Sequence, residues 1–354
     1  MFGLFTPKGP FRALIESSGK SFQVEEKDNL LKAALGAGLR WPHNCRVGSC
    51  GTCRARLVHG KIKPLQDFSY VLSAEELDQG YILACQSRLR SDVVVEVDLQ
   101  VGEAAGAVVK SASGVIESCT RLTHDILEVR IRLTEPMPAY VAGQYADVLV
   151  SGMSAARSYS FARAPSEGEA DEAAFFVRHV PGGQFTDWLH AGDRSGERVT
   201  LSGPYGQFWL RESDRPVLLI AGGSGLAPIR AILKEACKRN CQRQIIFLFG
   251  ARTQRDLYCI EDIEEIRSQL NGRFHFVPVL SHEPGESDWR GARGMVTEFV
   301  HKQGLDLAAC EVYLCGPPPM IDAAIDVLKN SGVADEQIFF DKFLDASHIP
   351  GGRK

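Results

Sequence analysis

The sequence predicts a multidomain protein in which an α+β domain is followed by an antiparallel β-barrel and then by a doubly wound α/β domain with a parallel sheet. Its 354 residues exceed one domain, at roughly 150 residues per domain. A stretch of small residues near residue 100, QVGEAAGAV, is typical of a linker. Near residue 215 the pattern changes from short strands separated by turns to apolar strands that alternate with helices. We therefore expect domains over residues 1–100, 107–210 and 215–345.

Composition and charge argue against several classes of protein. Apolar residues make up 44% of the chain and charged residues 24%, as in ordinary globular proteins. The formal net charge of −4 offers no strong field for nucleic acid, and no apolar run reaches the roughly 18 residues of a membrane span. The N-terminus, MFGLFTPKGP, lacks the basic and apolar regions of a secretory signal. We expect a monomeric cytoplasmic protein with reduced cysteines and without a nucleic-acid or membrane partner.

Local patterns predict the elements of each domain. Residues 11–24 alternate apolar and polar side chains around a Ser-Gly turn, which predicts a β-hairpin. Residues 28–38 predict a helix that Asp28 caps and a glycine ends, and residues 53–62 predict one strand. Barrel strands are expected over 114–122, 126–133 and 144–150, and strands of a parallel sheet over 216–223, 244–250, 273–280 and 311–316, with helices such as 229–238 on both of its faces.

A group of cysteines gives the most specific signal. Cys45, Cys50 and Cys53 have the spacing C-x4-C-x2-C, and Cys85 follows later, which is the plant-type [2Fe–2S] spacing. The glycines at positions 48 and 51 allow the loop to bend around a cluster. A zinc site or buried structural cysteines are the alternatives, although zinc favours two compact cysteine pairs. The remaining cysteines form no such group, and we expect most of them to be small core residues: 119, 237, 241, 259, 310 and 315.

Two stretches of the second domain offer groups for a flavin. Arg157, Tyr159 and Ser160 end a predicted strand and could bind a phosphate, cover a ring and bond to a ring nitrogen. In VRHVPGGQFTDWL, Gly182 and Gly183 precede a short helix and could cradle a pyrophosphate. A solvated strand end and a plain turn with a helix cap are the alternatives.

The third domain carries a glycine-rich loop directly between a strand and a helix. Glycines there allow a diphosphate to approach the backbone closely, and Pro228 suits the first turn of the helix. CGPPPM follows a later strand, and ligands bind at this edge of open parallel sheets. A core position is the alternative for the cysteine of that motif. The coenzyme residues expected from the two motifs are Gly222, Gly223, Ser224, Gly225, Pro228, Cys315, Gly316 and Met320.

These motifs resemble known families. Residues 1–100 resemble a plant-type ferredoxin with a β-grasp fold, which implies that Cys45 and Cys50 hold the more exposed iron and that Cys53 and Cys85 hold the inner one. Residues 157–160, 182–186 and 203–206 resemble the ferredoxin–NADP⁺ reductase superfamily. That resemblance implies FAD, with Arg157 on its phosphate, Tyr159 on its ring system, Ser160 near the reactive ring nitrogen, and Gly182, Gly183 and Thr186 at the pyrophosphate.

The same resemblance implies a catalytic region. Cys315 would lie beside the nicotinamide, with Gly316 and Met320 shaping the site, and Phe343 would lie over the flavin. A plain packed aromatic is the alternative for Phe343, because the chain continues beyond it. The expected catalytic residues are therefore Cys315, Ser160 and Phe343.

The whole chain resembles the NADH-dependent reductase component of bacterial multicomponent oxygenases. The resemblance implies that NADH reduces FAD and that single electrons leave through the cluster to an oxygenase component or an intermediate ferredoxin. A reductase for a non-oxygenase acceptor and a non-catalytic iron–sulfur sensor are the alternatives. We expect NADH rather than NADPH, with Arg252 against the adenosine, although Arg252 and Arg255 could also hold a 2′-phosphate.

The charge of the first domain suggests how a partner docks. Residues 1–100 contain 13 Lys and Arg residues and 11 Asp and Glu residues, a formal charge of +2 before any cluster is counted. Arg46 lies in the cysteine loop, and Arg54 and Arg56 follow it. We expect these three arginines to meet acidic groups of the electron acceptor. A solvated basic strand is the alternative.

Overall fold

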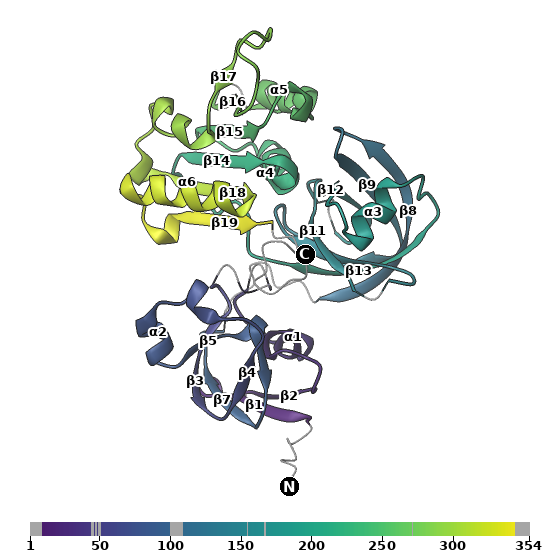
Figure 1. Ribbon diagram of the computed structural model, residues 1–354, viewed down its shortest axis with the longest axis vertical. Helices are drawn as coiled ribbons and strands as arrows, with labels where there is room; N and C mark the ends of the chain where they lie inside the picture. Colours follow the sequence, from purple (N-terminus) through teal and green to yellow (C-terminus); the bar gives the residue numbers. More distant parts are fainter. Residues whose placement is uncertain are drawn as a thin grey trace. The chain divides into compact units, whose positions relative to one another are not determined.

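The computed structural model describes residues 9–43, 46, 48, 51–99, 109–153, 155–165, 168–270 and 272–343. The chain divides into two compact units, Met1–Val109 with Ala346–Lys354 and Lys110–Asp345, which we call the N-terminal unit and the reductase unit (Figure 1). The linker expected near residue 100 falls largely on residues outside the described ranges. No helix among the described residues is long and apolar enough to cross a membrane.

The N-terminal unit is built on a mixed sheet with the strand order β2-β1-β7-β3-β5. The predicted hairpin is confirmed, because β1 and β2 pair antiparallel, and β7 then pairs parallel to β1. Ala13, Ile15, Leu30 and Ala34 are fully buried in a core that the sheet shares with α1. The elements are β1 (Phe11–Ile15), β2 (Ser21–Val24), α1 (Leu30–Gly36), β3 (Arg54–His59), β4 (Ile62–Pro64), η1 (Phe68–Tyr70), α2 (Ala74–Asp78), β5 (Tyr81–Leu83), η2 (Ala84–Gln86), β6 (Ser87–Leu89) and β7 (Val93–Glu96).

The predicted cap of α1 is wrong by one residue. Asn29 is the N-cap, and its Oδ1 accepts a hydrogen bond of 2.8 Å from the backbone N–H of Lys32. Asp28 lies outside the helix and pairs with the Lys32 ammonium at 2.6 Å. Both residue types cap helices well, so the sequence alone favoured neither.

The single strand predicted over residues 53–62 is also wrong, because the chain turns at Gly60 and forms two strands in different sheets. Gly60 has a φ of +102°, and a Cβ there would lie 2.3 Å from the backbone oxygen of Asp92. β3 stays in the mixed sheet, whereas β4 pairs with β6 in a separate two-stranded sheet. Only glycine suits a turn this close to another backbone.

Gly60→Ala should therefore destabilise the N-terminal unit by about 3 kcal/mol, through a disfavoured φ and a backbone clash. Urea unfolding of the full chain, followed by the visible absorbance of the iron–sulfur centre, measures the effect. Gly36→Ala is the matched control, since no atom lies within 4 Å of a Cβ at that helical position. We expect the control to be neutral or slightly stabilising. Equal unfolding midpoints for the two variants would contradict this explanation of the turn.

The reductase unit begins with an antiparallel barrel, as predicted. Its sheet has the strand order β11-β10-β13-β8-β9-β12. Phe161, which follows β11, bridges Phe175 of β12, and the N–H of Ala162 donates to Ala174 at 2.8 Å. The two ends of the sheet therefore meet around an apolar interior. The elements are β8 (Lys110–Arg121), β9 (Ile126–Met137), β10 (Tyr145–Val150), β11 (Arg157–Ser160), β12 (Ala170–Arg178), α3 (Gln184–His190) and β13 (Arg198–Tyr205).

A parallel sheet with the strand order β17-β16-β15-β14-β18-β19 follows, and all of its pairings are parallel. Successive residues of β14 point to opposite faces, so that Leu219 packs in the core that contains α4 and α5, and Leu218 and Ile220 pack in the core that contains α6. The predicted doubly wound fold, with helices on both faces, is confirmed (Figure 1).

The main elements of this region are β14 (Val217–Gly222), η3 (Gly223–Gly225), α4 (Leu226–Lys238), β15 (Ile245–Ala251), η4 (Gln254–Asp256), α5 (Ile260–Gln269), β16 (Phe274–Leu280), β17 (Ala292–Arg293), β18 (Glu311–Gly316), α6 (Pro318–Asn330) and β19 (Ile338–Lys342). Short 3₁₀ turns connect the later ones: η5 (Val296–Phe299), η6 (His301–Gln303), η7 (Leu307–Ala309) and η8 (Asp335–Gln337).

Candidate cofactor sites

Neighbouring strands of the N-terminal unit bring two of the predicted cluster ligands together. Cys53 directly precedes β3, and Cys85 lies in η2 directly after β5. β3 and β5 pair antiparallel, and the N–H of Ala84 donates to the carbonyl of Cys53 at 3.1 Å. Both thiols are buried, as ligands of an inner iron would be. Cys45 and Cys50 lie outside the described residues.

The loop that precedes Cys53 has a tightly turned backbone, which could surround a cluster. Arg46, Gly48 and Gly51 all have a left-handed φ, between +54° and +83°. The Gln66 side chain donates to the carbonyl of Gly48 at 2.6 Å, and a Cβ on Gly48 would lie 2.1 Å from that side chain. The positive φ and these close contacts therefore favour glycine at position 48. Buried thiols beside such a loop fit a [2Fe–2S] cluster.

Two of the arginines expected to dock a partner each form an ion pair with a carboxylate of the same unit. The guanidinium of Arg54 pairs with Glu76 at 2.9 Å, and the guanidinium of Arg56 pairs with Glu96. Both pairs are exposed, so each contributes little to stability. Their charges are nevertheless compensated locally, which weakens the attraction that Arg54 and Arg56 offer to an acidic partner.

The predicted flavin residues lie along β11, at one end of the barrel sheet. Arg157 is exposed, the Tyr159 ring packs 5.4 Å from that of Phe185, and Ser160 is buried. Burial raises the pKa of Tyr159 far above its ordinary value, so its phenol stays neutral. The side chains thus change along β11 from an exposed cation to a packed ring and then a buried hydroxyl. This order fits a flavin whose phosphate lies at the surface and whose ring system points inward.

The glycine pair before α3 forms an open loop. Gly182 has a φ of +79°, and no atom lies within 4 Å of a Cβ built there. A Cβ on Gly183 would lie 2.6 Å from the Thr186 hydroxyl. That hydroxyl accepts from the N–H of Val180 at 3.1 Å and lies 2.9 Å from its carbonyl oxygen, so Thr186 holds the loop in shape. The space at Gly182 fits a phosphate group close to the backbone.

The structure brings the two predicted nicotinamide motifs to the same edge of the parallel sheet. β14 and β18 are neighbours, with Ala221 opposite Cys315, so the glycine loop and CGPPPM leave the sheet side by side. A Cβ on Gly225 would lie 2.3 Å from the backbone oxygen of Cys315, and a Cβ on Gly316 would lie 2.8 Å from that of Gly222. These glycines allow the two segments to touch.

A cavity of about 310 Å³ lies beside these motifs. Gly222, Gly223, Arg252 and Met320 line it, as a coenzyme site would require. The other residues expected at the coenzyme are not part of this lining: Ser224, Gly225, Pro228, Cys315 and Gly316. Pro228 is buried in the first turn of α4, and its role at the coenzyme stays a prediction.

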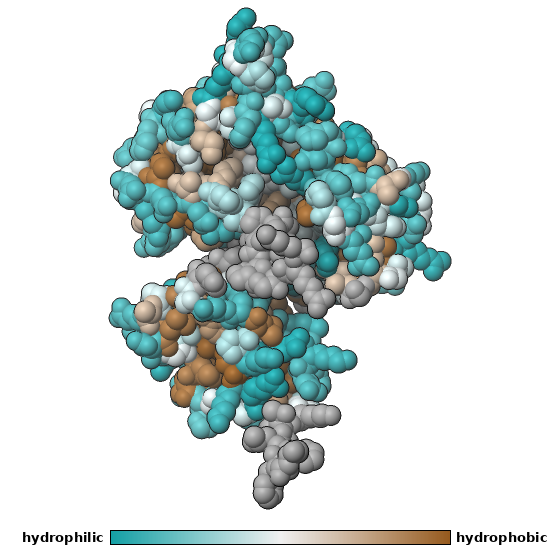
Figure 2. All heavy atoms as spheres, viewed as in Figure 1, coloured by the Kyte–Doolittle hydropathy of each residue, from teal (hydrophilic) through white to brown (hydrophobic). Residues whose placement is uncertain are grey.

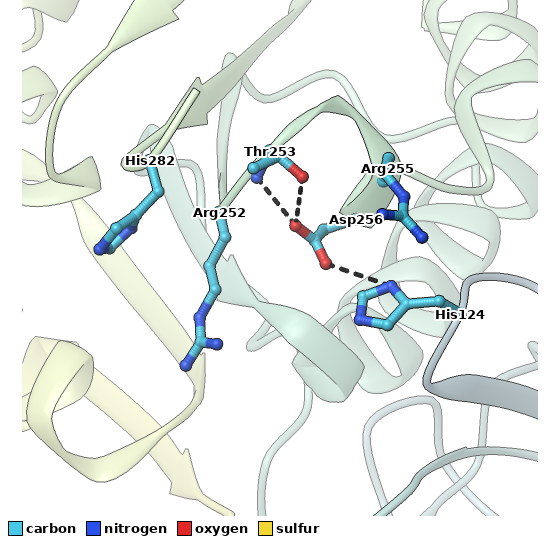
Figure 3. A pocket seen from close by; sticks show the side chains of 6 residues that line it. All are labelled: His124, Arg252, Thr253, Arg255, Asp256 and His282. Carbon is cyan, nitrogen blue, oxygen red and sulfur yellow. Dashed lines mark hydrogen bonds and ion pairs between the residues drawn. The ribbon is translucent and has the colours of Figure 1, made fainter. Parts of the chain in front are cut away.

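A second cavity, of about 500 Å³, shares Arg252 and Asp256 with the first (Figure 3). The Asp256 carboxylate accepts from the N–H and the hydroxyl of Thr253 at 2.8 and 2.9 Å, and it lies 3.7 Å from the imidazole of His124. Arg255 and His282 complete the basic lining. A mostly basic cavity that adjoins the cavity beside the glycine loop fits a coenzyme with charged phosphates.

Sequence reasoning missed Asp341, a buried carboxylate on β19. Asp341 is opposite Cys315 in the sheet, and the Ser160 hydroxyl donates to its Oδ2 at 3.5 Å. Burial, and then the charge of Asp341, raise the pKa of the Cys315 thiol well above its ordinary value. The thiol is therefore neutral, and its role cannot be that of a thiolate nucleophile. The signal available in the sequence was a single acid among the phenylalanines of FFDKF.

Arg178 was also missed, although it lies within VRHVPGGQFTDWL, the stretch expected at the flavin. It ends the buried strand β12, and its Nε donates to Asp125 at 2.7 Å. A Cβ on Gly223 would lie 3.5 Å from its Nη1. The barrel therefore extends a cation over the glycine loop of the parallel sheet, at the wall of the first cavity. A charged residue at the end of an apolar strand was the signal for it.

Phe343 follows β19 directly. Its backbone N–H donates to the carbonyl of Gly316 at 2.9 Å, and its ring packs partly buried against the core of the α4 face. The chain beyond it lies outside the described residues. Its expected place over the flavin stays a prediction.

Comparisons with known proteins identify the cofactors of all three regions. The chain matches the 2Fe-2S iron-sulfur cluster binding domain over residues 14–90, the oxidoreductase FAD-binding domain over 113–209 and the oxidoreductase NAD-binding domain over 219–326. It is 42% identical to the xylene/toluene monooxygenase electron transfer component XylA of Pseudomonas putida, over 97% of this chain and 96% of that protein. The chain belongs to the reductase components of multicomponent oxygenases.

Other relatives of this reductase agree. It is 34% identical to the phenol 2-monooxygenase reductase component DmpP of a Pseudomonas strain, over 96% of both chains. The crystal structure of the Amycolatopsis cytochrome P450 reductase GcoB superposes with a TM-score of 0.81 at 34% identity, over 94% of this reductase and 98% of that chain. The predicted family and the predicted cofactors, a [2Fe–2S] cluster, FAD and NADH, are confirmed. The zinc alternative loses its basis, because the matched N-terminal domain binds an iron–sulfur cluster.

Proposed function

We propose that this reductase takes a hydride from NADH at the buried point where Ser160, Cys315 and Asp341 meet, and that electrons leave through the N-terminal unit to an oxygenase component or an intermediate ferredoxin. The contact of 3.5 Å between the Ser160 hydroxyl and Asp341 carries this proposal. Ser160 belongs to the strand expected at the flavin, and Asp341 is paired with the strand expected at the nicotinamide. The two redox partners of a hydride transfer would therefore meet there.

Each proposed group of residues has its own task. When bound, FAD and the [2Fe–2S] cluster supply the redox chemistry that side chains lack, namely the conversion of a two-electron hydride into single electrons. Ser160, Cys315 and Asp341 are all buried and keep water from the transfer point. The cluster would be held by Cys45, Cys50, Cys53 and Cys85, and FAD by Arg157, Tyr159, Ser160, Gly182, Gly183 and Thr186.

The two cavities of the reductase unit are the proposed site of the coenzyme. Arg178 and Arg252 lie on the wall of the smaller cavity, where their guanidinium groups can bind a diphosphate. We propose NADH as the preferred coenzyme, as the match to an NAD-binding domain supports. Steady-state kinetics with both coenzymes tests this choice, and a larger kcat/KM with NADPH would overturn it.

Asp341→Asn should slow the reduction of bound flavin by NADH by roughly 10², because the position of the Ser160 hydroxyl and of the coenzyme depends on a buried carboxylate. Anaerobic stopped-flow mixing, which follows the bleaching of the flavin band, measures this rate. Asp335→Asn is the matched control, since Asp335 is an exposed acid of the same region that pairs with Lys329 at 2.7 Å. If the two variants reduce flavin equally fast, the proposed transfer point is wrong.

The acceptor is the other half of the proposal. Two of the relatives described above are named for monooxygenases, which supports an oxygenase as the acceptor. Co-purification followed by NADH consumption with the added partner separates this acceptor from a non-oxygenase protein. A cytoplasmic location, a monomeric state and the absence of nucleic-acid and membrane partners stay predictions.

A further inference from the structure

Four cations share one face of the small sheet formed by β4 and β6. We call Lys61, Lys63, Arg88 and Arg90 the basic ribbon. Lys63 is directly opposite Arg88, and the N–H of Arg90 donates to the carbonyl of Lys61 at 2.8 Å, which places the second pair opposite each other. Side chains alternate along a strand, so these four point to one side while Ile62 and Leu89 point inward. Lys61, Lys63 and Arg88 are exposed, and Arg90 is half-buried.

The basic ribbon is not compensated by the fold. Lys32, Arg54 and Arg56 each pair with a carboxylate of the N-terminal unit, but no ion pair joins any ribbon cation to a carboxylate among the described residues. Like charges directly opposite each other across two strands are destabilising. The repulsion between the ribbon cations therefore lowers the free energy of unfolding of this unit.

The basic ribbon adjoins the proposed cluster. β6 begins two residues after Cys85, and the N–H of Leu65, just after β4, donates to the carbonyl of Gln86 at 2.8 Å. The next residue, Gln66, is the one whose side chain binds Gly48 in the cluster loop. Leu65 itself is 43% exposed. Figure 2 shows several apolar residues on the visible face of this unit. An uncompensated positive face and an exposed leucine therefore lie next to the point where electrons would leave.

We propose that the basic ribbon, with Leu65 at its edge, is the surface on which the electron-acceptor protein docks through an acidic patch. This proposal rests on the proposed function, since it needs electrons to leave through the N-terminal unit. Complementary charge would steer the acceptor toward the cluster and raise the association rate, and Leu65 would add an apolar contact beside the charges. The ribbon takes the role first expected of Arg54 and Arg56, whose charges have partners within the unit.

Charge reversal tests the steering. Lys63→Glu with Arg88→Glu inverts the middle of the ribbon, and Lys20→Glu with Lys27→Glu is the matched control. Lys20 and Lys27 are exposed, lie around the β1–β2 hairpin and form no ion pair among the described residues. The acceptors are two haem proteins of opposite charge, acidic cytochrome b5 and basic cytochrome c. Each rate is divided by the NADH–ferricyanide rate of the same sample, which needs no protein partner.

The ribbon reversal should lower the relative rate with cytochrome b5 at least about 10-fold more than the control does at low ionic strength. The same variant should raise the relative rate with cytochrome c. Both differences should shrink as salt screens the charges. Equal effects of the ribbon and control reversals on both acceptors would overturn the proposal.

A single substitution gives a second signature. Lys63→Glu places a carboxylate opposite Arg88, so it replaces a like-charge pair by an attractive one. We expect a higher midpoint of thermal unfolding for the N-terminal unit together with a slower reduction of cytochrome b5. A higher midpoint with an unchanged rate would assign Lys63 no docking role.

If the wild-type reductase reduces ferricyanide but neither haem protein, the proposed exit through the N-terminal unit fails, and the ribbon loses its role with it.

Discussion

Cys85→Ser should separate the two halves of the electron path. Cys85 is fully buried in η2, in a chain segment separate from the loop that carries the other proposed ligands, and a thiolate is the favoured ligand of iron. The variant should therefore lose its cluster or hold it weakly. The reductase unit is a separate compact unit, so FAD should remain bound and NADH should still reduce ferricyanide. Reduction of a protein acceptor should fall by at least about 10².

Two assays on one sample, with the FAD content checked, measure this separation. Cys119→Ser is the control, because Cys119 is a half-buried free thiol of the reductase unit and no proposed ligand. Loss of NADH–ferricyanide activity while FAD stays bound would show that the cluster is more than a downstream carrier. Protein-acceptor reduction that persists without the cluster would show that the proposed exit is wrong.

Gly225→Ala should have the largest effect on the nicotinamide side. A Cβ at this position would lie 2.3 Å from the oxygen and 2.5 Å from the carbon of the Cys315 carbonyl, and 2.8 Å from the N of Gly316. Because all three atoms are backbone, either the glycine loop or the end of β18 must move. We expect KM for NADH to rise at least about 10-fold, kcat to fall, and the reductase unit to lose about 1–3 kcal/mol.

Steady-state kinetics and urea unfolding of the full chain measure both effects of Gly225→Ala. Gly192→Ala in the same unit is the control, because no atom lies within 4 Å of a Cβ there and its φ is ordinary. FAD content should stay the same in both variants, since neither glycine belongs to the proposed flavin loop. Unchanged KM and kcat in Gly225→Ala would mean that the close contact of the two motifs does not matter for the coenzyme.

The sequence was sufficient for most of the fold because its signals there are local. Apolar runs that end in glycine predicted β14 and β18, and the rule that ligands bind at the carboxyl edge predicted that their loops would meet. Gly60 shows where local signals fail. A single glycine in a strand pattern is compatible with a bulge, a close approach or a break, and only its contact with Asp92 decides between them.

The parts of the site that were missed depend on pairs far apart in the chain. Ser160 and Asp341 are separated by 181 positions, and their contact follows from how the barrel packs against the parallel sheet. Arg54 and Arg56 were visible as charges, but their partners, Glu76 and Glu96, are set by strand register and by the place of α2. A single sequence does not give that register, so it could not show which cations of the unit lack a carboxylate.

One anaerobic experiment tests most directly whether electrons enter at the Ser160–Asp341–Cys315 point and leave through the N-terminal unit. NADH is mixed in a stopped-flow instrument with the complete protein and with protein that has its cluster but has been stripped of FAD. In the complete protein, the flavin band should bleach before the cluster absorbance changes, and Asp341→Asn should slow the first phase. In the FAD-stripped protein, the cluster should stay oxidised. Reduction of the cluster by NADH at the same rate without FAD would contradict the account.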